Sequence, residues 1–314
     1  MAEAPGPPQP ELPPETTVGV LVGHTIEVAL RAMREHEAGV REGADPDHVR
    51  KTRVAVRRLR SNLRTFEGFL QGETVAPVLD ELGQLGTELG RVRDREVLQA
   101  RLKGLARVLP DAERHLAVEL TERLGAEIAA AREDAVRYLD SDRYPKLLQE
   151  LTVLASEPPL IGEASRPALE LAGELARRPW LRLRRFVHKI GRNPEDADLH
   201  RARILAKRSR YAATAVAPVV GPPAADFARA AAGLQDVLGE HQDAVTAESW
   251  LASTPLEGRA AFVAGQLAGL ERAAAVVARG RWKEAWQELD RDELREWMAK
   301  PAPPSPAETA STTP

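Results

Sequence analysis

Apolar side chains recur every three to four positions through most of the chain, which is the spacing that an amphipathic α-helix requires. Strand-like alternation is nearly absent, and short segments with Pro or Gly interrupt the periodic stretches. The pattern predicts an all-α protein, with helix ends defined to about 2–4 residues. The predicted helical spans are 16–40, 46–71, 74–104, 110–140, 143–155, 166–191, 195–217, 223–252, 256–279 and 282–298.

Proline-rich segments flank the helical pattern at both ends. Residues 1–15 and 299–314 contain few large apolar side chains, and such segments bury too little surface to offset the loss of chain entropy. We therefore predict disordered tails at both ends and a folded region over 16–298.

A basic segment occurs twice along the chain, 150 residues apart: RKTRVAVRRLR at 50–60 aligns with HRARILAKRSR at 200–210. Downstream, LGRVRD at 89–94 aligns with LGEHQD at 238–243 after a slip of one residue. The aligned basic pairs are Arg53 with Arg203, Arg57 with Lys207, Arg58 with Arg208, Arg60 with Arg210 and, upstream, Arg34 with Arg184. The economical interpretation is an internal duplication into two similar helical bundles, at about 16–140 and 143–298, related by a pseudo-two-fold axis.

Each copy of the repeat puts its basic residues on one face of a helix. At 100° per residue, the cations of the first copy fall within an arc of about 80°, and apolar residues lie opposite. We call the basic faces the first stripe, comprising Arg50, Arg53, Arg57, Arg60 and Arg64, and the second stripe, comprising His200, Arg203, Lys207 and Arg210 with Tyr211 at its margin. The apolar faces, predicted to be core, comprise Val49, Val56, Leu59, Leu63 and Phe66 in one copy and Leu199, Ala202, Ala206, Ala213 and Val216 in the other.

Neither stripe contains an acidic residue. A solvated face is the plain interpretation of one such stripe, but solvated faces usually mix signs, because opposite charges four residues apart stabilise a helix by a few tenths of a kcal/mol. Because the same unpaired repulsion among basic residues occurs in both stripes, an anionic partner that compensates it is favoured. Arginine meets two phosphate oxygens with its planar fork of donors. The first stripe spans about 21 Å at 1.5 Å per residue, which suits an extended polyanion.

Composition narrows the functional classes. The net charge of −3 argues against coating nucleic acid by bulk charge. The chain has no cysteine, and none of its seven histidines has metal-motif spacing, so no metal or cofactor is predicted. No signal peptide and no uninterrupted apolar run near ~20 residues is found, so we expect a cytoplasmic chain without a membrane partner. The five tryptophans do not interleave with the stripes and are expected to pack in the core.

The basic segments resemble the core pattern of the CHAD family, named for a conserved histidine in an α-helical domain. The matching segments are RKTRVAVRRLRSNLRTF at 50–66, LGRVRDREVL at 89–98, PWLRLRRFVHK at 179–189, LHRARILAKRSRYA at 199–212 and LGEHQDAVTAESWL at 238–251. The resemblance covers about 16–298. It implies two pseudo-symmetric, antiparallel four-helix bundles with a basic groove that binds inorganic polyphosphate without catalysis, often at polyphosphate granules. We predict as polyphosphate-binding residues both stripes together with Arg34, Arg58, Arg184 and Arg208.

One departure from the family pattern concerns its histidines. Arg50 stands at the first histidine position, while His48 lies about 160° around the helix and off the stripe. Only the second copy keeps a histidine in register, His200. Permanent charge, more than histidine chemistry, is therefore expected to carry binding. Arg93 and Asp94 are candidates either for closing the groove or for a structural ion pair.

Three other functions stay open at this point. Nucleic acid is also a linear polyanion, although the scarcity of aromatic residues and the lack of a reading motif count against it. A polyphosphate-processing enzyme would need carboxylates to hold Mg²⁺, which the stripes lack, and no phosphate-binding loop or nucleophile elbow is present. The third alternative is a helical scaffold without a ligand. The sequence makes no prediction of oligomeric state.

Overall fold

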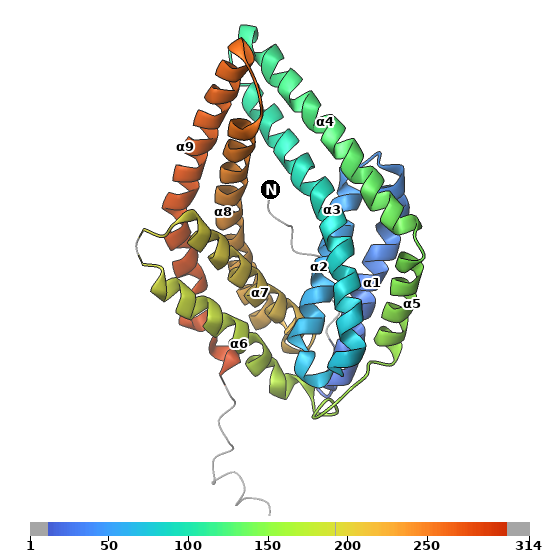
Figure 1. The fold of residues 1–314 in the computed structure, drawn as a ribbon. Coiled ribbons are helices and arrows are strands. Elements are labelled where there is room, and N and C mark those ends of the chain that lie inside the picture. Colours follow the sequence, from blue (N-terminus) through green and yellow to red (C-terminus); the bar gives the residue numbers. More distant parts are fainter. Residues whose placement is uncertain (1–11, 192, 300–314) are drawn as a thin grey trace, which may run out of the picture.

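The computed structural model describes residues 12–191 and 193–299, and in these residues nine α-helices follow one another (Figure 1). Short 3₁₀ turns follow α2, at Glu67–Phe69, and α9, at Asp292–Leu294 and Glu296–Met298. The all-α prediction is confirmed. The helices are α1 Val18–Glu42, α2 Pro46–Thr65, α3 Gly72–Ala106, α4 Asp111–Asp140, α5 Arg143–Ser156, α6 Ala168–Lys189, α7 Asp196–Val220, α8 Pro222–Ser253 and α9 Gly258–Leu289.

Local sequence signals set the tight connection between α1 and α2. Gly43 ends α1 in the left-handed conformation, with φ at 69°, and its N–H donates to the carbonyl of Gly39. Glycine adopts this conformation without steric cost. Asp45 then caps α2, since its side chain accepts a hydrogen bond from the N–H of Asp47, and Pro46 occupies the first turn. The first stripe therefore begins at a sharply defined helix start.

Two groups of helices, α1–α5 and α6–α9, meet at two places. One meeting place is the contact of α2 with α7, and the other joins the far ends of α3 and α4 to those of α8 and α9. Figure 1 shows α3 and α4 on one side of a central space and α8 and α9 on the other. A small apolar cluster at the far ends, which we call the tip cluster, includes Leu98, Leu102, Leu120, Leu124, Leu251, Val263 and Leu267.

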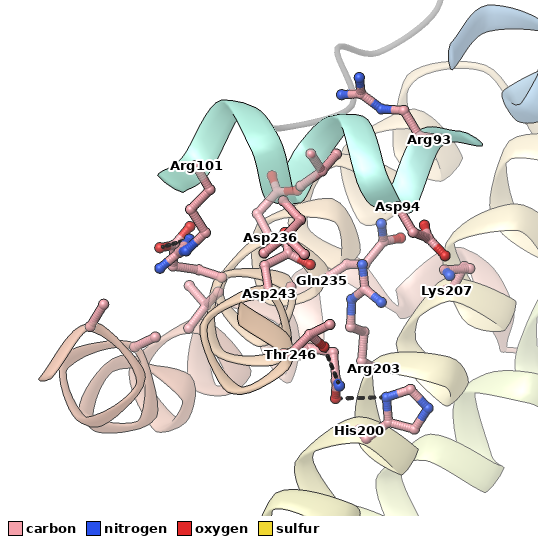
Figure 2. A pocket seen from close by; sticks show the side chains of 18 of the residues that line it. Arg93, Asp94, Arg101, His200, Arg203, Lys207, Gln235, Asp236, Asp243 and Thr246 are labelled. Atoms are coloured by element: carbon pink, nitrogen blue, oxygen red, sulfur yellow. Dashed lines mark hydrogen bonds and ion pairs between the residues drawn. The ribbon is translucent and has the colours of Figure 1, made fainter. Parts of the chain in front are cut away.

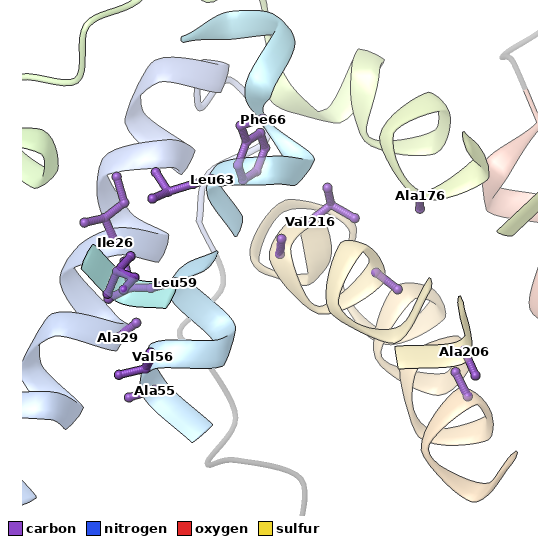
Figure 3. Packing of buried hydrophobic residues seen from close by; sticks show 14 of the residues in the cluster. Ile26, Ala29, Ala55, Val56, Leu59, Leu63, Phe66, Ala176, Ala206 and Val216 are labelled. Atoms are coloured by element: carbon purple, nitrogen blue, oxygen red, sulfur yellow. The ribbon is translucent and has the colours of Figure 1, made fainter. Parts of the chain in front are cut away.

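The main core runs through both groups of helices and contains the two predicted apolar faces. Leu59 and Leu63 of α2 pack beside Ile26 of α1, and Phe66, just after the end of α2, belongs to the same core, as does Val216 of α7 (Figure 3). Three of the tryptophans are buried, and Trp180 stacks on Trp286 with ring centroids 5.3 Å apart. The stripes therefore lie on the faces of α2 and α7 that point away from the core.

Three details of the predicted organisation differ from the structure. A break was expected near residue 280, but α9 is continuous, because a single glycine costs a helix only about 1 kcal/mol and the buried Trp282 and Trp286 anchor the turns that follow. Helix α5, placed at the start of the second bundle from the sequence, packs on α1, α3 and α4. Leu12 was assigned to a disordered tail, yet its N–H donates to the Pro218 carbonyl at 2.7 Å and its side chain contacts the core.

Of the predicted tails, residues 1–11 and 300–314 lie outside the described residues. The helix starts repeat with the offset seen in the sequence: α6, α7 and α8 begin 150 residues after α1, α2 and α3. Helix α9 begins 147 residues after α4. The recurrence is consistent with an internal duplication, which stays a prediction.

Helix α9 is long and apolar enough to cross a membrane by length and composition alone. Phe262, Val276 and Val277 are exposed on it. The helix also packs along α8 and carries Glu271, a fully buried carboxylate, as expected of a helix in a packed assembly. The expectation that the chain has no membrane partner stays a prediction.

We expect Gly39→Ala to destabilise the fold. A Cβ atom at Gly39 would lie 2.2 Å from Cγ of the His48 ring, so α1 and α2 would have to separate. The expected loss is about 1–3 kcal/mol in the free energy of unfolding, measured by denaturant titration. Gly233→Ala in α8 is the control, because no described atom lies within 4 Å of its Cβ position, and it should be neutral or gain up to about 1 kcal/mol. An unchanged Gly39→Ala midpoint would contradict the tight packing.

Candidate functional site

A cavity of about 880 Å³ lies between the two groups of helices, with walls from α2, α3, α7, α8 and α9 (Figure 2). We call it the central cavity. The α2–α7 contact and the tip cluster hold the helices that line it. Residues from both stripes meet there, although they are 150 positions apart in sequence. The predicted binding residues that line it are Arg50, Arg53, Arg57, His200, Arg203 and Lys207.

Two glycines make room for the arginines at equivalent positions of the stripes. The Cβ position of Gly90 on α3 lies 3.7 Å from Nε of Arg53, and that of Gly239 on α8 lies 3.4 Å from Nε of Arg203. A side chain longer than alanine at either glycine would need the space that the arginine occupies. Both glycines belong to the repeated Leu-Gly segments downstream of the stripes.

The positive charges in the central cavity oppose one another. Burial lowers the pKa of Arg53, Asp94 acts against that shift, and the charges of Arg57 and Arg203 lower the pKa further. Asp94 on α3 lies 3.2 Å from a guanidinium nitrogen of Arg53. The cavity therefore concentrates cations at a spacing where an added anion would be stabilised.

The two stripes touch where α2 crosses α7. Nε of Arg57 donates a hydrogen bond to the Tyr211 hydroxyl at 2.7 Å, and Tyr211 is buried. The Arg210 guanidinium lies over the same ring, 4.9 Å from its centroid. Tyr211 was expected at the margin of the second stripe, but it joins the stripes instead. Arg210 is itself buried and does not line the central cavity.

Side chains at the start of each stripe are held by hydrogen bonds. Nε of Arg50 donates to Asp47 at 2.6 Å, and this bond together with that from Lys51 lowers the pKa of Asp47 to about 2. Nδ1 of His200 lies 2.8 Å from the Gln242 side-chain oxygen, and the Gln242 amide donates to Thr246 (Figure 2). Both anchors fix the direction of a cationic or polar side chain at the cavity wall.

Acidic residues enter the central cavity from α3 and α8, which the acid-free stripes did not reveal. Asp94, Asp236, Glu240 and Asp243 are part of the lining. Burial raises the pKa of Asp243, against the effects of Arg203 and Arg101. The cavity is therefore mixed in charge. No stripe position is acidic; Asp47 at the start of α2 pairs with Arg50, and facing helices supply further compensation.

Sequence reasoning missed Arg101, which lines the cavity from α3. Its guanidinium contacts Glu271 of α9 at 2.6 Å and Glu240 of α8 at 2.7 Å. Burial would lower the pKa of Arg101, but the bonds to these carboxylates outweigh it and raise the pKa. No local signal could find this contact, because its partners lie on helices far along the chain. Arg281, Gln235 and Thr246 also line the cavity without a sequence signal.

Several predicted binding residues lie outside the central cavity. Arg60 and Arg64 line a second hollow of about 580 Å³ between α2 and α3. Arg34 donates to the Thr152 hydroxyl on α5, and Arg184 lies 3.3 Å from Asp290. Arg34 and Arg184 were predicted only from the offset of 150 residues between the two copies. In the structure their side chains contact α5 and Asp290 instead. Arg58 and Arg208 line neither hollow.

Candidate metal ligands do not gather in the part of the chain that the structure describes: no group of three or more His, Cys, Asp or Glu there could hold an ion. The side chains of the central cavity can instead bind anions by charge and hydrogen bonding. Fold and site together define a class of all-α proteins with a cation-lined cavity between two groups of helices. The chain belongs to the CHAD domain family, since residues 24–252 match the CHAD domain.

Solved structures resemble this fold. PptA from Streptomyces chartreusis superposes with a TM-score of 0.71 at 23% identity, over 87% of this chain and 100% of that one. The CHAD domain from the plant Ricinus communis superposes with a TM-score of 0.63 at 25% identity, over 94% and 96%. These similarities confirm the expected CHAD-like fold.

Two curated relatives come from Mycobacterium tuberculosis: the uncharacterized proteins MT2285 of strain CDC 1551 / Oshkosh and Rv2226 of strain ATCC 25618 / H37Rv. Each is 30% identical over 254 residues, which is 78% of this chain and 48% of the relative. The chain thus spans about half the length of the curated relatives it matches.

We expect Arg101→Ala to destabilise the protein by about 3–5 kcal/mol, because Glu271 is fully buried and would lose its cation. Burial already raises the pKa of Glu271, and Arg101 opposes that shift. The loss should therefore be largest at neutral pH and shrink as the pH falls and Glu271 takes up a proton. Denaturant titrations at several pH values measure this.

Arg91→Ala is the matched control on the same helix. Arg91 is exposed and pairs with Glu88 three residues away, and such pairs contribute about 0–1 kcal/mol. An equal loss for both variants, or a loss for Arg101→Ala that does not change with pH, would contradict the role assigned to the buried pair.

Proposed function

We propose that the protein binds inorganic polyphosphate in its central cavity and that it does so without catalysis. Membership of the CHAD domain family supports polyphosphate as the ligand, because the resemblance to that family implies polyphosphate binding. One observation carries the proposal: the basic residues of two distant segments line the same cavity, and six of the predicted binding residues are among them.

The residue types fit a chain of phosphates. Arginine presents a rigid fork to two oxygens at once and stays charged at any cellular pH, and Lys207 adds a mobile point charge. A hydrogen bond to a charged group contributes about 1.5–3 kcal/mol. A few such contacts acting together are enough for tight binding. A linear polymer can also contact several cations of both stripes at once, since residues of both line the same cavity.

A binding role without catalysis is consistent with the chemistry of the lining. Phosphoryl transfer usually relies on Mg²⁺ held by clustered carboxylates, and the carboxylates of the cavity face arginines instead. Incubation of long-chain polyphosphate with the purified protein and Mg²⁺ or Mn²⁺ should release no phosphate above the level given by an Arg53→Gln/Arg203→Gln variant. Release that depends on those arginines would favour a processing enzyme.

We expect Arg53→Gln/Arg203→Gln to weaken binding of long-chain polyphosphate roughly a hundredfold, since two charge-assisted contacts are lost. The slope of log affinity against log salt should fall by about 0.7 for each phosphate contact, by analogy with single-stranded nucleic acids. Calorimetry or fluorescence anisotropy over a salt series measures both quantities.

Arg34→Gln/Arg184→Gln is the control, because it removes the same charge at two sites outside the cavity. Its affinity should stay within about twofold of the unaltered protein, as expected for screened surface charges. Equal losses in the two double variants would point to bulk charge and contradict a cavity site.

Nucleic acid is the second candidate, because it too is a linear polyanion and the cavity is lined by arginines. We expect polyphosphate to displace duplex DNA and single-stranded RNA at equal phosphate concentration, because no Phe, Tyr or Trp of residues 12–191 and 193–299 lines the cavity to stack on a base. Preferential binding of nucleic acid in this competition would reverse the assignment. A location in the cytoplasm at polyphosphate granules is part of the proposal. A fluorescently tagged chain should lose its focal distribution in cells that cannot make the polymer.

A further inference from the structure

Two arginines from helices without a stripe contact the loops that precede the two stripe helices. Arg132 of α4 donates through Nη1 to the carbonyl of Gly43, between α1 and α2. Arg279 of α9 donates through Nη1 to the carbonyl of Pro194, between α6 and α7. The two arginines are 147 positions apart, which is also the offset between the starts of α4 and α9. We call Arg132 and Arg279 the anchoring arginines.

The second terminal nitrogen of each anchoring arginine binds a carboxylate. Nη2 of Arg132 donates to Oε1 of Glu96 on α3 at 2.8 Å, and Glu96 is buried. Nη2 of Arg279 donates to Asp196, the first residue of α7. The same carboxylate lies 3.0 Å from Nε2 of His241, which is buried on α8. Each guanidinium fork is therefore occupied by a loop carbonyl and a carboxylate, which fixes the loop relative to the helix of the arginine.

The anchoring arginines differ from other arginines on the same helices. Their side chains are 27% and 29% exposed, and they line neither of the two hollows. Arg137 of α4 is 68% exposed and pairs with Asp134 three residues away. Arg272 of α9 is 70% exposed and pairs with Glu248 on the neighbouring helix α8. The anchoring arginines are thus placed to hold loops, and they are not placed to contact a ligand in the central cavity.

The loops that they hold lie within about one turn of the stripes. On α2, Asp47 comes four residues after Gly43 and accepts the hydrogen bond from Arg50, the first cation of the first stripe. On α7, Asp196 comes four residues before His200, which is a rise of about 6 Å. A displaced loop would therefore carry Arg50 and His200 away from their places at the cavity wall.

A second route connects each anchoring arginine to the lining of the cavity. Oε2 of Glu96, the carboxylate that binds the α4 arginine, lies 3.6 Å from Nη1 of Arg93, which lines the cavity. On α8, His241 is followed directly by Gln242, whose side-chain oxygen lies 2.8 Å from Nδ1 of His200. The contacts of both arginines thus continue to cavity-lining side chains through the third helix of each group.

We propose that Arg132 and Arg279 are positioning residues, which fix the starts of α2 and α7 and thereby hold Arg50 and His200 at the wall of the central cavity. This rests on the proposed function and extends it to α4 and α9. The fork of arginine is required, because lysine is a point charge on a flexible stem and does not reproduce the same two bonds. Without these bonds, binding has to order the side chains of Arg50 and His200, which lowers affinity.

The test is the Arg132→Lys/Arg279→Lys variant, which keeps both positive charges and removes both forks. We expect its affinity for long-chain polyphosphate to fall about tenfold, since two side chains must then be ordered on binding. Amide hydrogen exchange should also become faster in the two loops and in the first turns of α2 and α7. Affinity is measured at one salt concentration and at a temperature where every variant is fully folded.

Arg137→Lys/Arg272→Lys is the matched control, because it makes the same change at two exposed arginines of the same helices. Its affinity should stay within about twofold of the unaltered protein. A double-mutant cycle separates positioning from a general effect on the fold. In an Arg50→Gln/His200→Gln background, the two lysine substitutions should change affinity by less than about twofold, because the side chains that they position are already absent.

Unchanged affinity of the Arg132→Lys/Arg279→Lys variant, or an equal loss in the two backgrounds, would overturn the inference. A loss of affinity without faster exchange at the starts of α2 and α7 would also count against it. If the unaltered protein binds no polyphosphate, the proposed function itself fails, whereas the other outcomes remove only the positioning role. The two failures are therefore distinguishable.

Discussion

The approach of like charges across the α2–α7 crossing is the constraint around which this structure is arranged. Arg53 is partly buried, and the nearby charges of Arg57 and Arg203 disfavour its charged form. The fold tolerates this because Tyr211 accepts a hydrogen bond from Arg57 and Asp94 faces Arg53. These contacts neutralise only part of the positive charge in the cavity. The stripe cations come from α2 and α7, whereas the acidic residues that face them come from other helices. A negatively charged ligand would complete the neutralisation.

The apolar packing serves this electrostatic arrangement. The main core fixes α2 and α7 by the faces opposite the stripes, and the tip cluster joins the far ends of α3, α4, α8 and α9. Between these two contacts the buried pair of Arg101 and Glu271 connects α3 to α9. The cavity is therefore held by contacts at both ends and along one wall, which keeps the separation of the stripes constant.

Helical periodicity was enough to predict the class of fold, the two stripes and the apolar faces behind them, because these depend on residues close together in sequence. The distribution of the cations in space was only partly predictable. Arg53 and Arg203 meet in the cavity, whereas Arg34 and Arg184 face α5 and Asp290, since an offset of 150 residues says nothing about which neighbour covers a helix face. Continuity of α9 through Gly280 required knowledge of its packing against the core.

The two glycines opposite the arginines also constrain how this sequence can change over time. Each of Gly90 and Gly239 shares its space with one guanidinium group, so glycine and arginine form a coupled pair of positions. A side chain longer than alanine at 90 or 239 would need the space of the guanidinium group at 53 or 203, and a shorter residue there would remove a charge from the cavity. Substitutions at the four positions are therefore not independent. In related chains, each of these glycines should vary together with the arginine on the facing helix.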